Sequence, residues 1–221
     1  MNSRDKILSE IRSARQNPSL SATAFESINT AGEKAADKPP KNLPAMVQQF
    51  QKELQIVAGE FYLADTEAKA VDIIANCLKQ EGFSRLMTSG TPGAERLAKR
   101  LNAAFTILSP PADQERKSYF ADIPVALVDV DWAIAETGAL VIHTRGAKST
   151  FPYFLPQCLI ALVRSSQLLA DNQELFDTIE DKDAQNTMMI TGPSRTADIE
   201  KILILGAHGP RRLLVIFMEN E

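Results

Sequence analysis

The chain has 221 residues, of which 44% are hydrophobic and 24% are charged, and its formal net charge is −4. A chain of this length and composition can bury its own hydrophobic core, as one large domain or as one domain with an arm. The acidic balance excludes a broad nucleic-acid-binding surface, which needs a basic footprint, and it disfavours binding to anionic lipid.

The N-terminal residues do not have the pattern of a targeting segment. Lys6, Glu10 and Arg12 interrupt the first apolar residues, whereas a signal peptide needs an unbroken apolar stretch. No later apolar run approaches the roughly 20 residues that a transmembrane helix needs. We therefore expect a cytoplasmic protein that does not bind a membrane.

Residues 1–43 are predicted to form an N-terminal helix and a proline-bearing linker. Ile7, Leu8 and Ile11 recur at helical spacing, which predicts a helix of about three turns over residues 3–17. The residues that follow are rich in Ser, Ala, Lys and Pro, a composition typical of an extended linker. The apolar stripe of this helix has three open partners: the same subunit, a second copy of the chain, or another protein.

From residue 44 onward, the hydrophobic pattern alternates between helices and strands. A helix is predicted from Met46 to Leu54, and Asp65 is the expected N-cap of the helix after the first strand. Because strands that alternate with helices at this spacing form parallel βαβ units, we predict an α/β domain over 44–221. Its core is expected to be an open, mostly parallel sheet flanked by helices on both faces. The first four predicted strands are 60–64, 85–88, 105–108 and 125–128.

The second half of the chain continues with apolar runs separated by polar turns. We predict strands at 159–163 and 188–190, and a helix over 167–178. Two further buried segments are predicted at 202–205 and 213–217, and the last of these is a strand. The sequence contains no Gly-x-Ser-x-Gly nucleophile elbow, which disfavours a hydrolase built on a Ser-His-Asp triad.

Glu136 is the first candidate functional residue. It lies between two apolar runs, where a carboxylate is costly unless it is paired or lines a cleft. Three roles are open for it: a structural acceptor for backbone N–H groups, a general base, or a group that orients a ligand. The adjacent Thr137 and Gly138 complete this candidate ligand-binding turn.

The polar stretch TGPSRTADIE at 191–200 is the main candidate binding site, because it directly follows an apolar run. Glycine permits a positive φ or the close approach of a ligand, and the following proline stiffens the turn. The arginine offers a planar fork for a carboxylate or a phosphate, and the hydroxyl groups can donate or accept hydrogen bonds. The structural alternative is a strand-to-helix turn with Ser194 or Thr196 as N-cap. The candidate ligand-binding residues are Thr191, Gly192, Ser194, Arg195, Thr196 and Asp198.

Few residues are available for metal or cofactor chemistry. Cys77 and Cys158 are the only cysteines and no C-x-x-C occurs, so this chain alone cannot build an iron–sulfur cluster or a thiolate zinc site. Both thiols are predicted to be core residues, and no metal site is expected. His208 lies in an Ala-His-Gly-Pro turn, where it is either a hydrogen-bonded turn residue or, like Glu136, a candidate catalytic and ligand-binding residue.

Three motifs occur in the chain in a characteristic order: AETG at 135–138, ITGPSRTADIE at 190–200 and LGAHGP at 205–210. In combination they resemble the lactate-utilisation protein C family, whose members are LUD-domain proteins. The similarity extends over residues 44–221 in the order of the elements. Two positions depart from the common family pattern, Ala139 in place of Thr and Ala207 in place of Val, and both changes are small.

The resemblance implies a fold similar to that of glucosamine-phosphate deaminase, ribose-phosphate isomerase and the CoA-transferases. It also implies a role as one component of a three-protein bacterial system that oxidises L-lactate to pyruvate, in which the other two components carry the iron–sulfur cysteines. On this basis we expect the chain to hold no cofactor and to act as a non-redox subunit or accessory protein beside iron–sulfur partner subunits.

Two hypotheses from different classes follow. In the first, the chain is a lactate-oxidation subunit whose cleft binds a small carboxylate or phosphate, or docks a cluster-bearing partner. In the second, it is a stand-alone enzyme of the CoA-transferase or sugar-phosphate isomerase type, with Glu136 as nucleophile or base and the Thr191 turn holding an anion. Self-association is left open by both. The cleft of the first hypothesis contains Glu136, Thr137, Ser194, Arg195 and His208.

Overall fold

The computed structural model describes residues 42–109, 123–145, 149–179, 184–197, 203–205 and 209–219. The chain divides into two units, Met1–Lys38 and Pro39–Glu221, and every described residue belongs to the second unit. The helix predicted over 3–17 and most of the predicted linker lie outside the described residues.

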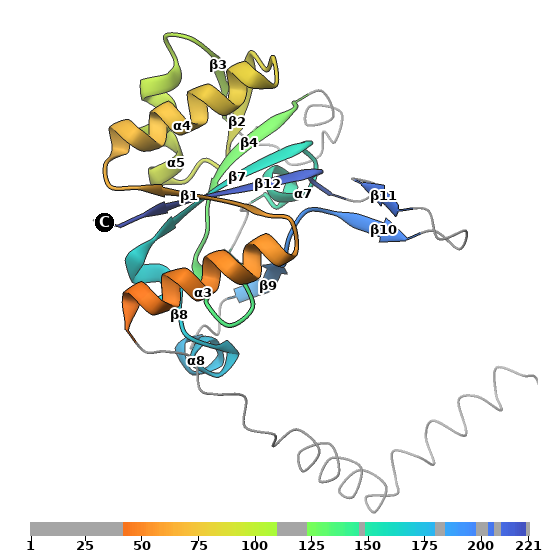
Figure 1. Cartoon of the computed structure of the whole chain (residues 1–221). Coiled ribbons are helices and arrows are strands. Elements are labelled where there is room, and N and C mark those ends of the chain that lie inside the picture. Colours follow the sequence, from red (N-terminus) through yellow and green to blue (C-terminus); the bar gives the residue numbers. More distant parts are fainter. Residues whose placement is uncertain are drawn as a thin grey trace, which may run out of the picture. The chain divides into compact units, whose positions relative to one another are not determined.

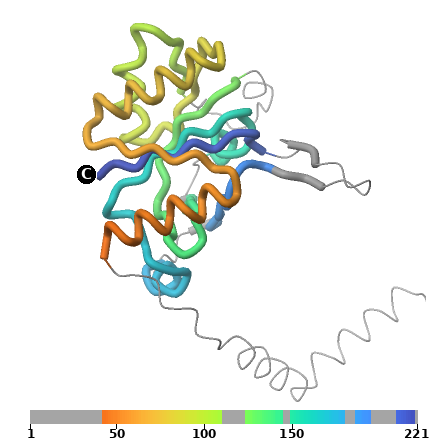
Figure 2. Tube along the Cα trace, viewed as in Figure 1, coloured from red at the N-terminus to blue at the C-terminus, as the bar shows by residue number. Residues whose placement is uncertain are grey.

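Six parallel strands form the main sheet, in the order β1-β12-β7-β4-β2-β3 (Figure 1). The predicted open, mostly parallel sheet flanked by helices is therefore confirmed. The last strand, β12, lies between β1 and β7, so the first and last strands of the described chain are neighbours in the sheet (Figure 2). The strands are β1 (Glu60–Ala64), β2 (Arg85–Thr88), β3 (Thr106–Leu108), β4 (Val125–Asp129), β7 (Cys158–Arg164) and β12 (Arg212–Met218).

The central strands are apolar on both faces because both faces are covered. In β12, Leu214 and Ile216 face one hydrophobic cluster, whereas Val215 and Phe217 face the other. This alternation follows from the period of two in a strand, which sends successive side chains to opposite faces. Helices α4 (Glu67–Gln80) and α5 (Pro92–Leu101) cover the first of these faces (Figure 1).

The N-cap of α4 is Thr66, whose hydroxyl accepts a hydrogen bond from the Lys69 N–H at 3.3 Å. The predicted cap, Asp65, is one residue too early, because the strand before it ends at Ala64 and leaves a two-residue turn. The end of the helix is as predicted: Gly82, just past the C-cap, has φ of +69°, a conformation that glycine adopts without strain.

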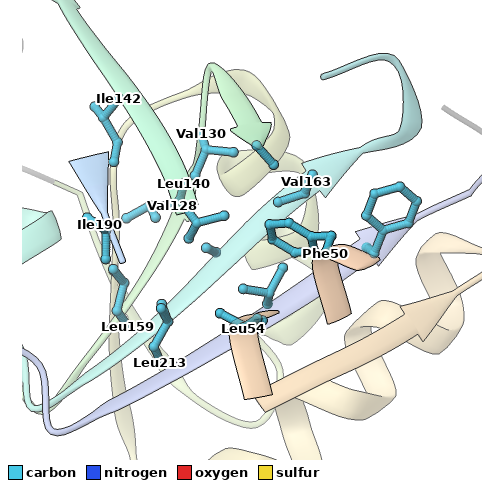
Figure 3. Close-up of a cluster of buried hydrophobic side chains, with 14 of the residues drawn as sticks. Phe50, Leu54, Val128, Val130, Leu140, Ile142, Leu159, Val163, Ile190 and Leu213 are labelled. Atoms are coloured by element: carbon cyan, nitrogen blue, oxygen red, sulfur yellow. The ribbon is translucent and has the colours of Figure 1, made fainter. Parts of the chain in front are cut away.

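Helix α3 (Leu43–Ile56) and a second sheet share the other face of the main sheet. Asn42 caps this helix by accepting a hydrogen bond from the Ala45 N–H at 3.0 Å. Phe50 and Leu54 of α3 are fully buried among side chains of the main sheet, such as Val163 and Leu213 (Figure 3). The predicted helical face of this segment is therefore the face that the structure buries.

The second sheet has the strand order β8-β5-β6-β9. Its strands β5 and β6 form an antiparallel hairpin, so the two apolar runs around Glu136 are adjacent strands of one layer. Leu140 and Ile142 point from this sheet into the cluster shared with α3 (Figure 3). The strands are β5 (Trp132–Ile134), β6 (Ala139–Arg145), β8 (Leu168–Leu169) and β9 (Ala184–Ile190).

The helix predicted over 167–178 is shorter than expected. Leu168–Leu169 forms β8, which pairs parallel with β5, and the helix α8 (Asn172–Thr178) begins only after the N-cap Asp171. The two leucines pair with a strand from a distant part of the chain, which local periodicity does not reveal. The remaining short elements are η1 (Ser165–Gln167) and α7 (Phe151–Phe154), and within the described residues no helix has the length and apolar character needed to cross a bilayer.

Candidate functional site

The turn at 191–194 connects the second sheet to a two-stranded hairpin. It follows β9 and leads into β10 (Arg195–Ala197), which pairs antiparallel with β11 (Leu203–Leu205) (Figure 1). The predicted alternative, a helix capped by Ser194 or Thr196, is wrong, because the chain continues in an extended conformation and pairs with the next strand.

Close backbone packing holds this turn against two other segments. Gly192 has φ of +127°, and a Cβ added to it would lie 2.9 Å from Val57 Cγ2, just after the end of α3. The Ser194 N–H donates a hydrogen bond to the Pro210 carbonyl at 2.7 Å. A Cβ on Gly209 would lie 3.2 Å from Ser194 Cβ. The structure thus brings the 191–194 turn, Val57 and the turn before β12 together, although they are distant in the sequence.

A pocket of about 530 Å³ opens where these segments meet. Apolar side chains make most of its wall, and the hydroxyl-bearing Thr191 and Ser194 are its polar members. Phe154 and Met189 are partly exposed at it, whereas Tyr153 is fully buried behind it. The lining residues are Val57, Tyr153, Phe154, Met189, Ile190, Thr191, Gly192, Pro193, Ser194, Gly209 and Pro210.

The sequence-predicted site residues fall into four groups. Thr191, Gly192 and Ser194 line the pocket, whereas the turn carrying Glu136 does not. For Arg195 and Thr196 the structure describes the backbone of β10 but not the side chains. Asp198 and His208 lie outside the described residues.

Glu136 lies in the tight turn between β5 and β6 and is partly buried. Its N–H donates to the Ala170 carbonyl at 3.0 Å, and its Oε2 accepts a long hydrogen bond of 3.5 Å from the Asn172 amide. The hydroxyl of Thr137 is buried and has no hydrogen-bond partner among the described residues. The two hydrogen bonds of Glu136 tie the turn to the start of α8, and no residue of the turn lines the pocket.

Gly138 explains why this turn needs a glycine. Its φ is +66°, and an added Cβ would lie 2.5 Å from the Leu54 backbone nitrogen and 2.8 Å from the Glu53 carbonyl carbon. The turn therefore rests directly on the backbone of α3. Since Gly192 rests on Val57, both motif turns close on the same end of this helix.

A second polar cluster, which sequence analysis missed, lies at the carboxyl ends of the main-sheet strands. Asp129 ends β4 and is largely buried. Its Oδ1 accepts a hydrogen bond from Arg164 Nη2 at 3.1 Å, and its Oδ2 accepts one from the Ala94 N–H at 3.0 Å. Arg164 ends β7, and Ala94 is in the first turn of α5, so one carboxylate joins two strands and a helix.

The ion pair of this cluster packs tightly against Gly93. A Cβ on Gly93 would lie 2.3 Å from Asp129 Oδ1 and 2.2 Å from Arg164 Nη2, so only glycine fits here without displacing the ion pair. The carboxylate faces the amino end of α5, where the helix dipole also favours negative charge. With an arginine and a helix N–H on its two oxygens, Asp129 is suited to hold elements together. The sequence shows that Asp129 and Arg164 each end an apolar run, but only the strand order shows that β4 and β7 are neighbours.

Tyr153 connects the two regions. It contributes to the pocket wall, and its hydroxyl donates a hydrogen bond of 3.3 Å to the Asp129 carbonyl. Burial, followed by the negative charge of Asp131, raises the pKa of this phenol above its ordinary value of 10.0. Both effects disfavour the phenolate, so Tyr153 acts as a hydrogen-bond donor in the folded protein.

Comparisons with known proteins converge on one family. The LUD domain family model matches residues 47–218. The chain is 26% identical to the uncharacterized protein YkgG of Escherichia coli (strain K12) over 184 residues, which cover 78% of each chain. It is 24% identical to lactate utilization protein C of Bacillus pumilus (strain SAFR-032) over 191 residues, which cover 80% of this chain and 79% of the relative.

Among solved structures, the crystal structure of a DUF162 family protein from Deinococcus radiodurans is similar to this one. The TM-score is 0.59 at 19% sequence identity, and the match covers 81% of this chain and 99% of that chain. At this identity the likeness concerns the fold alone.

The close approach of the Gly138 turn to α3 can be tested with a pair of glycine substitutions. Gly138→Ala and Gly82→Ala impose the same left-handed backbone cost, about 1–2 kcal/mol, because the two glycines have nearly equal φ. Only Gly138 faces a backbone; no atom lies within 4 Å of the Cβ position at Gly82. Urea denaturation should therefore show a loss in the free energy of unfolding that is about 1–3 kcal/mol larger for Gly138→Ala. Equal losses would contradict the packing of this turn on α3.

The buried phenol of Tyr153 predicts a specific loss of stability at alkaline pH. In the unfolded chain the phenol ionises near its ordinary pKa of 10.0, whereas the folded protein keeps it protonated at that pH. The folded state then binds more protons, so the free energy of unfolding falls as the pH rises above 10.0, by up to about 1.4 kcal/mol per pH unit.

Tyr153→Phe removes this ionisation and also the hydrogen bond to Asp129, which contributes about 1 kcal/mol at neutral pH. The stability advantage of the wild type over this variant should therefore shrink as the pH rises, as measured by denaturant titration at a series of pH values. The variant is its own control, because it lacks the Tyr153 phenol and therefore lacks this contribution to the fall in the free energy of unfolding above pH 10.0. A wild-type advantage independent of pH would show that the phenol ionises as it does in water.

Proposed function

Because the chain belongs to the LUD-domain family, we propose that it is a component of a bacterial system that oxidises L-lactate to pyruvate. The proposal is supported by the similarity to lactate utilization protein C of Bacillus pumilus over most of both chains. In this system the electrons from lactate pass to iron–sulfur clusters in partner proteins, and this chain acts as a subunit or accessory protein that holds no cluster.

The state of the two thiols supports a role without a cluster. Cys77 and Cys158 are both buried in the hydrophobic cluster beneath α4. A hydrogen bond between them raises the pKa of Cys158, to which burial adds, and lowers the pKa of Cys77. Each thiol is thus engaged with the other inside the core, so neither can reach a cluster held by a partner unless the core opens. Iron–sulfur clusters in proteins are held by several thiolates, usually four.

The single geometric observation behind the ligand site is the pocket at the 191–194 turn. Pockets of roughly 300–1,000 Å³ bind small molecules, and this one is within that range. Its polar members, the exposed Thr191 and the half-buried Ser194, supply hydroxyl donors beside the apolar wall. Hydroxyl groups can donate hydrogen bonds to a ligand carboxylate. We assign this pocket to a small carboxylate of the lactate and pyruvate class.

Arg195 is assigned the role of carboxylate anchor. It directly follows the pocket residue Ser194 and begins β10. A guanidinium can hold a carboxylate by two parallel charge-assisted hydrogen bonds, worth about 1.5–3 kcal/mol each in net stability. Lysine retains the charge but cannot form this fork.

The stand-alone enzyme alternative has weaker support. A CoA-transferase or an isomerase that used Glu136 as nucleophile or base would need this carboxylate at an open cavity beside its anion site. Glu136 instead accepts a hydrogen bond from Asn172 and does not line the pocket formed by the 191–194 turn. No contact of the described residues specifically favours this alternative.

Purification from native cells tests the proposed system. The tagged chain, isolated under anaerobic conditions, should bring with it iron-containing proteins and L-lactate-dependent reduction of a dye. The same chain produced alone in a host without the partners should be free of iron and inactive with lactate. An iron-free chain without lactate-dependent activity from both sources would contradict the assignment to lactate oxidation.

The anchor assignment is tested by Arg195→Lys. Because the lysine keeps the charge and loses the fork, pyruvate affinity, measured by calorimetry on the isolated chain, should fall by about tenfold or more. The exposed Arg211, which lies next to the pocket residue Pro210 in the sequence, provides the matched control Arg211→Lys, whose affinity should stay unchanged. Unaltered pyruvate binding in Arg195→Lys would remove the role given to Arg195 and leave the lactate proposal to the purification experiment.

A further inference from the structure

Strand β1 forms one edge of the main sheet and pairs with β12 on its inner side (Figure 1). The Ala64 carbonyl accepts a hydrogen bond from the Glu219 N–H, so Ala64 directs its backbone groups inward. Backbone direction alternates along a strand, which turns the N–H and C=O groups of Phe61 and Leu63 away from β12. These two residues therefore present the hydrogen-bonding groups of the sheet edge.

This edge lacks the charged side chains that usually protect a strand from pairing. Tyr62 and Leu63 are 36% and 38% exposed, although both are large and hydrophobic. The carboxylate of Glu60 at the start of the strand is already held by Arg212 through two hydrogen bonds of 2.8 Å. Proteins commonly place lysine, proline or a bulge on an edge strand to prevent association. An apolar edge of this kind is suited to pairing.

A groove of about 400 Å³ runs beside the same edge, between β1 and the amino-terminal half of α3. Most of its wall is apolar, and the partly exposed Leu43 and Leu63 lie at its two sides. The polar members are two glutamines of α3 and Glu219. The lining residues are Leu43, Pro44, Val47, Gln48, Gln51, Phe61, Leu63 and Glu219.

We propose that this edge is a homodimer interface, in which β1 pairs antiparallel with β1 of a second copy about a two-fold axis at Tyr62. In this register Phe61 of each copy lies opposite Leu63 of the other. Both residues carry the outward backbone groups, so each such pair exchanges two hydrogen bonds. Tyr62 of one copy lies opposite Tyr62 of the other, at the non-hydrogen-bonded position between these two pairs. The two main sheets then form one continuous sheet.

The side-chain chemistry of β1 matches itself in this register. The opposed pairs are Phe61 with Leu63, twice, and Tyr62 with Tyr62, and apolar or aromatic pairs of this kind stabilise neighbouring strands. Glu60 lies opposite Ala64, so no like charges face each other. Shifting the register two residues one way places Glu60 opposite Tyr62, and shifting it two residues the other way places Phe61 opposite Asp65. Both shifts therefore put a carboxylate opposite an aromatic side chain and lose this match.

The groove supplies the contact area that a short strand pair lacks. Stable interfaces bury roughly 1,200–2,000 Å², which exceeds the area of a five-residue strand pair. A two-fold axis perpendicular to the sheet keeps both α3 helices on the same side. The exposed Leu43 and the groove of one copy then face those of the other across the axis. A second copy therefore covers the edge and the groove together.

The oligomeric state of the full chain tests the proposal. Sedimentation across the micromolar range should show a dimer, and Leu63→Lys should weaken dimerisation by about tenfold or more, because it places a charge opposite an apolar side chain. Ile56→Lys is the matched control: Ile56 is 65% exposed on α3 and lies outside the groove lining, so this variant should dimerise like the wild type. Circular dichroism verifies that both variants are folded.

A cross-link tests the register independently of any loss of folding. In the proposed register the two Tyr62 residues are directly opposite at a position where Cα atoms are about 4.5 Å apart, within the range that a disulfide bridges. Tyr62→Cys should therefore form a covalent dimer on mild oxidation, whereas the exposed control Phe176→Cys and the wild type should not. A chain that is monomeric throughout, or a dimer that neither responds to Leu63→Lys nor cross-links through Tyr62→Cys, would overturn the proposal.

Discussion

The packing of helix α3 holds the core and the candidate pocket in place together. Its apolar face covers the main sheet, where Phe50 meets Phe61 with ring centroids 6.1 Å apart and Phe61 in turn meets Phe217 at 6.0 Å. The end of the same helix receives the two glycine turns that carry the family motifs, at Gly138 and Gly192. A displacement of α3 would therefore move both turns, so the helix fixes the wall of the candidate pocket as well as the core.

The Asp129 cluster and the candidate pocket lie at opposite ends of the main-sheet strands. In open α/β sheets, ligands commonly bind beyond the carboxyl ends of the strands. Here the buried carboxylate at that end, Asp129, already has Arg164 and a helix N–H as partners, and Gly93 packs tightly against the pair. The pocket instead opens at the amino ends, where the 191–194 turn meets the segment that precedes β12. Tyr153 lines the pocket, and its hydroxyl donates a hydrogen bond to the carbonyl of Asp129.

Besides the core and the two motif turns, α3 also borders the edge strand β1. The inner side of the helix covers the core, its end receives the motif turns, and its outer side forms the apolar groove beside β1. In a dimer built on this edge, each α3 would be held from the outside by the second copy. The same contact that joins the two sheets would thereby stabilise the helix on which the pocket depends, which couples assembly to the candidate site.

Local sequence patterns were sufficient to predict which segments form the main sheet and its helices. Glu60–Ala64 and Arg85–Thr88 are strands as predicted, because each is a short run bounded by polar residues or glycine, and the α3 residues Phe50 and Leu54 are buried as their spacing requires. Thr191, Gly192 and Ser194, which the sequence predicts to bind a ligand, line the candidate pocket, and the helix that was the alternative after them is absent because residues 195–197 form a strand. The tertiary structure alone decided that Leu168–Leu169 forms a strand, that Glu136 faces Asn172, and that Asp129 meets Arg164. Each of these contacts involves two segments that are distant along the chain. Local periodicity predicts the type of each segment but not which distant segment packs against it.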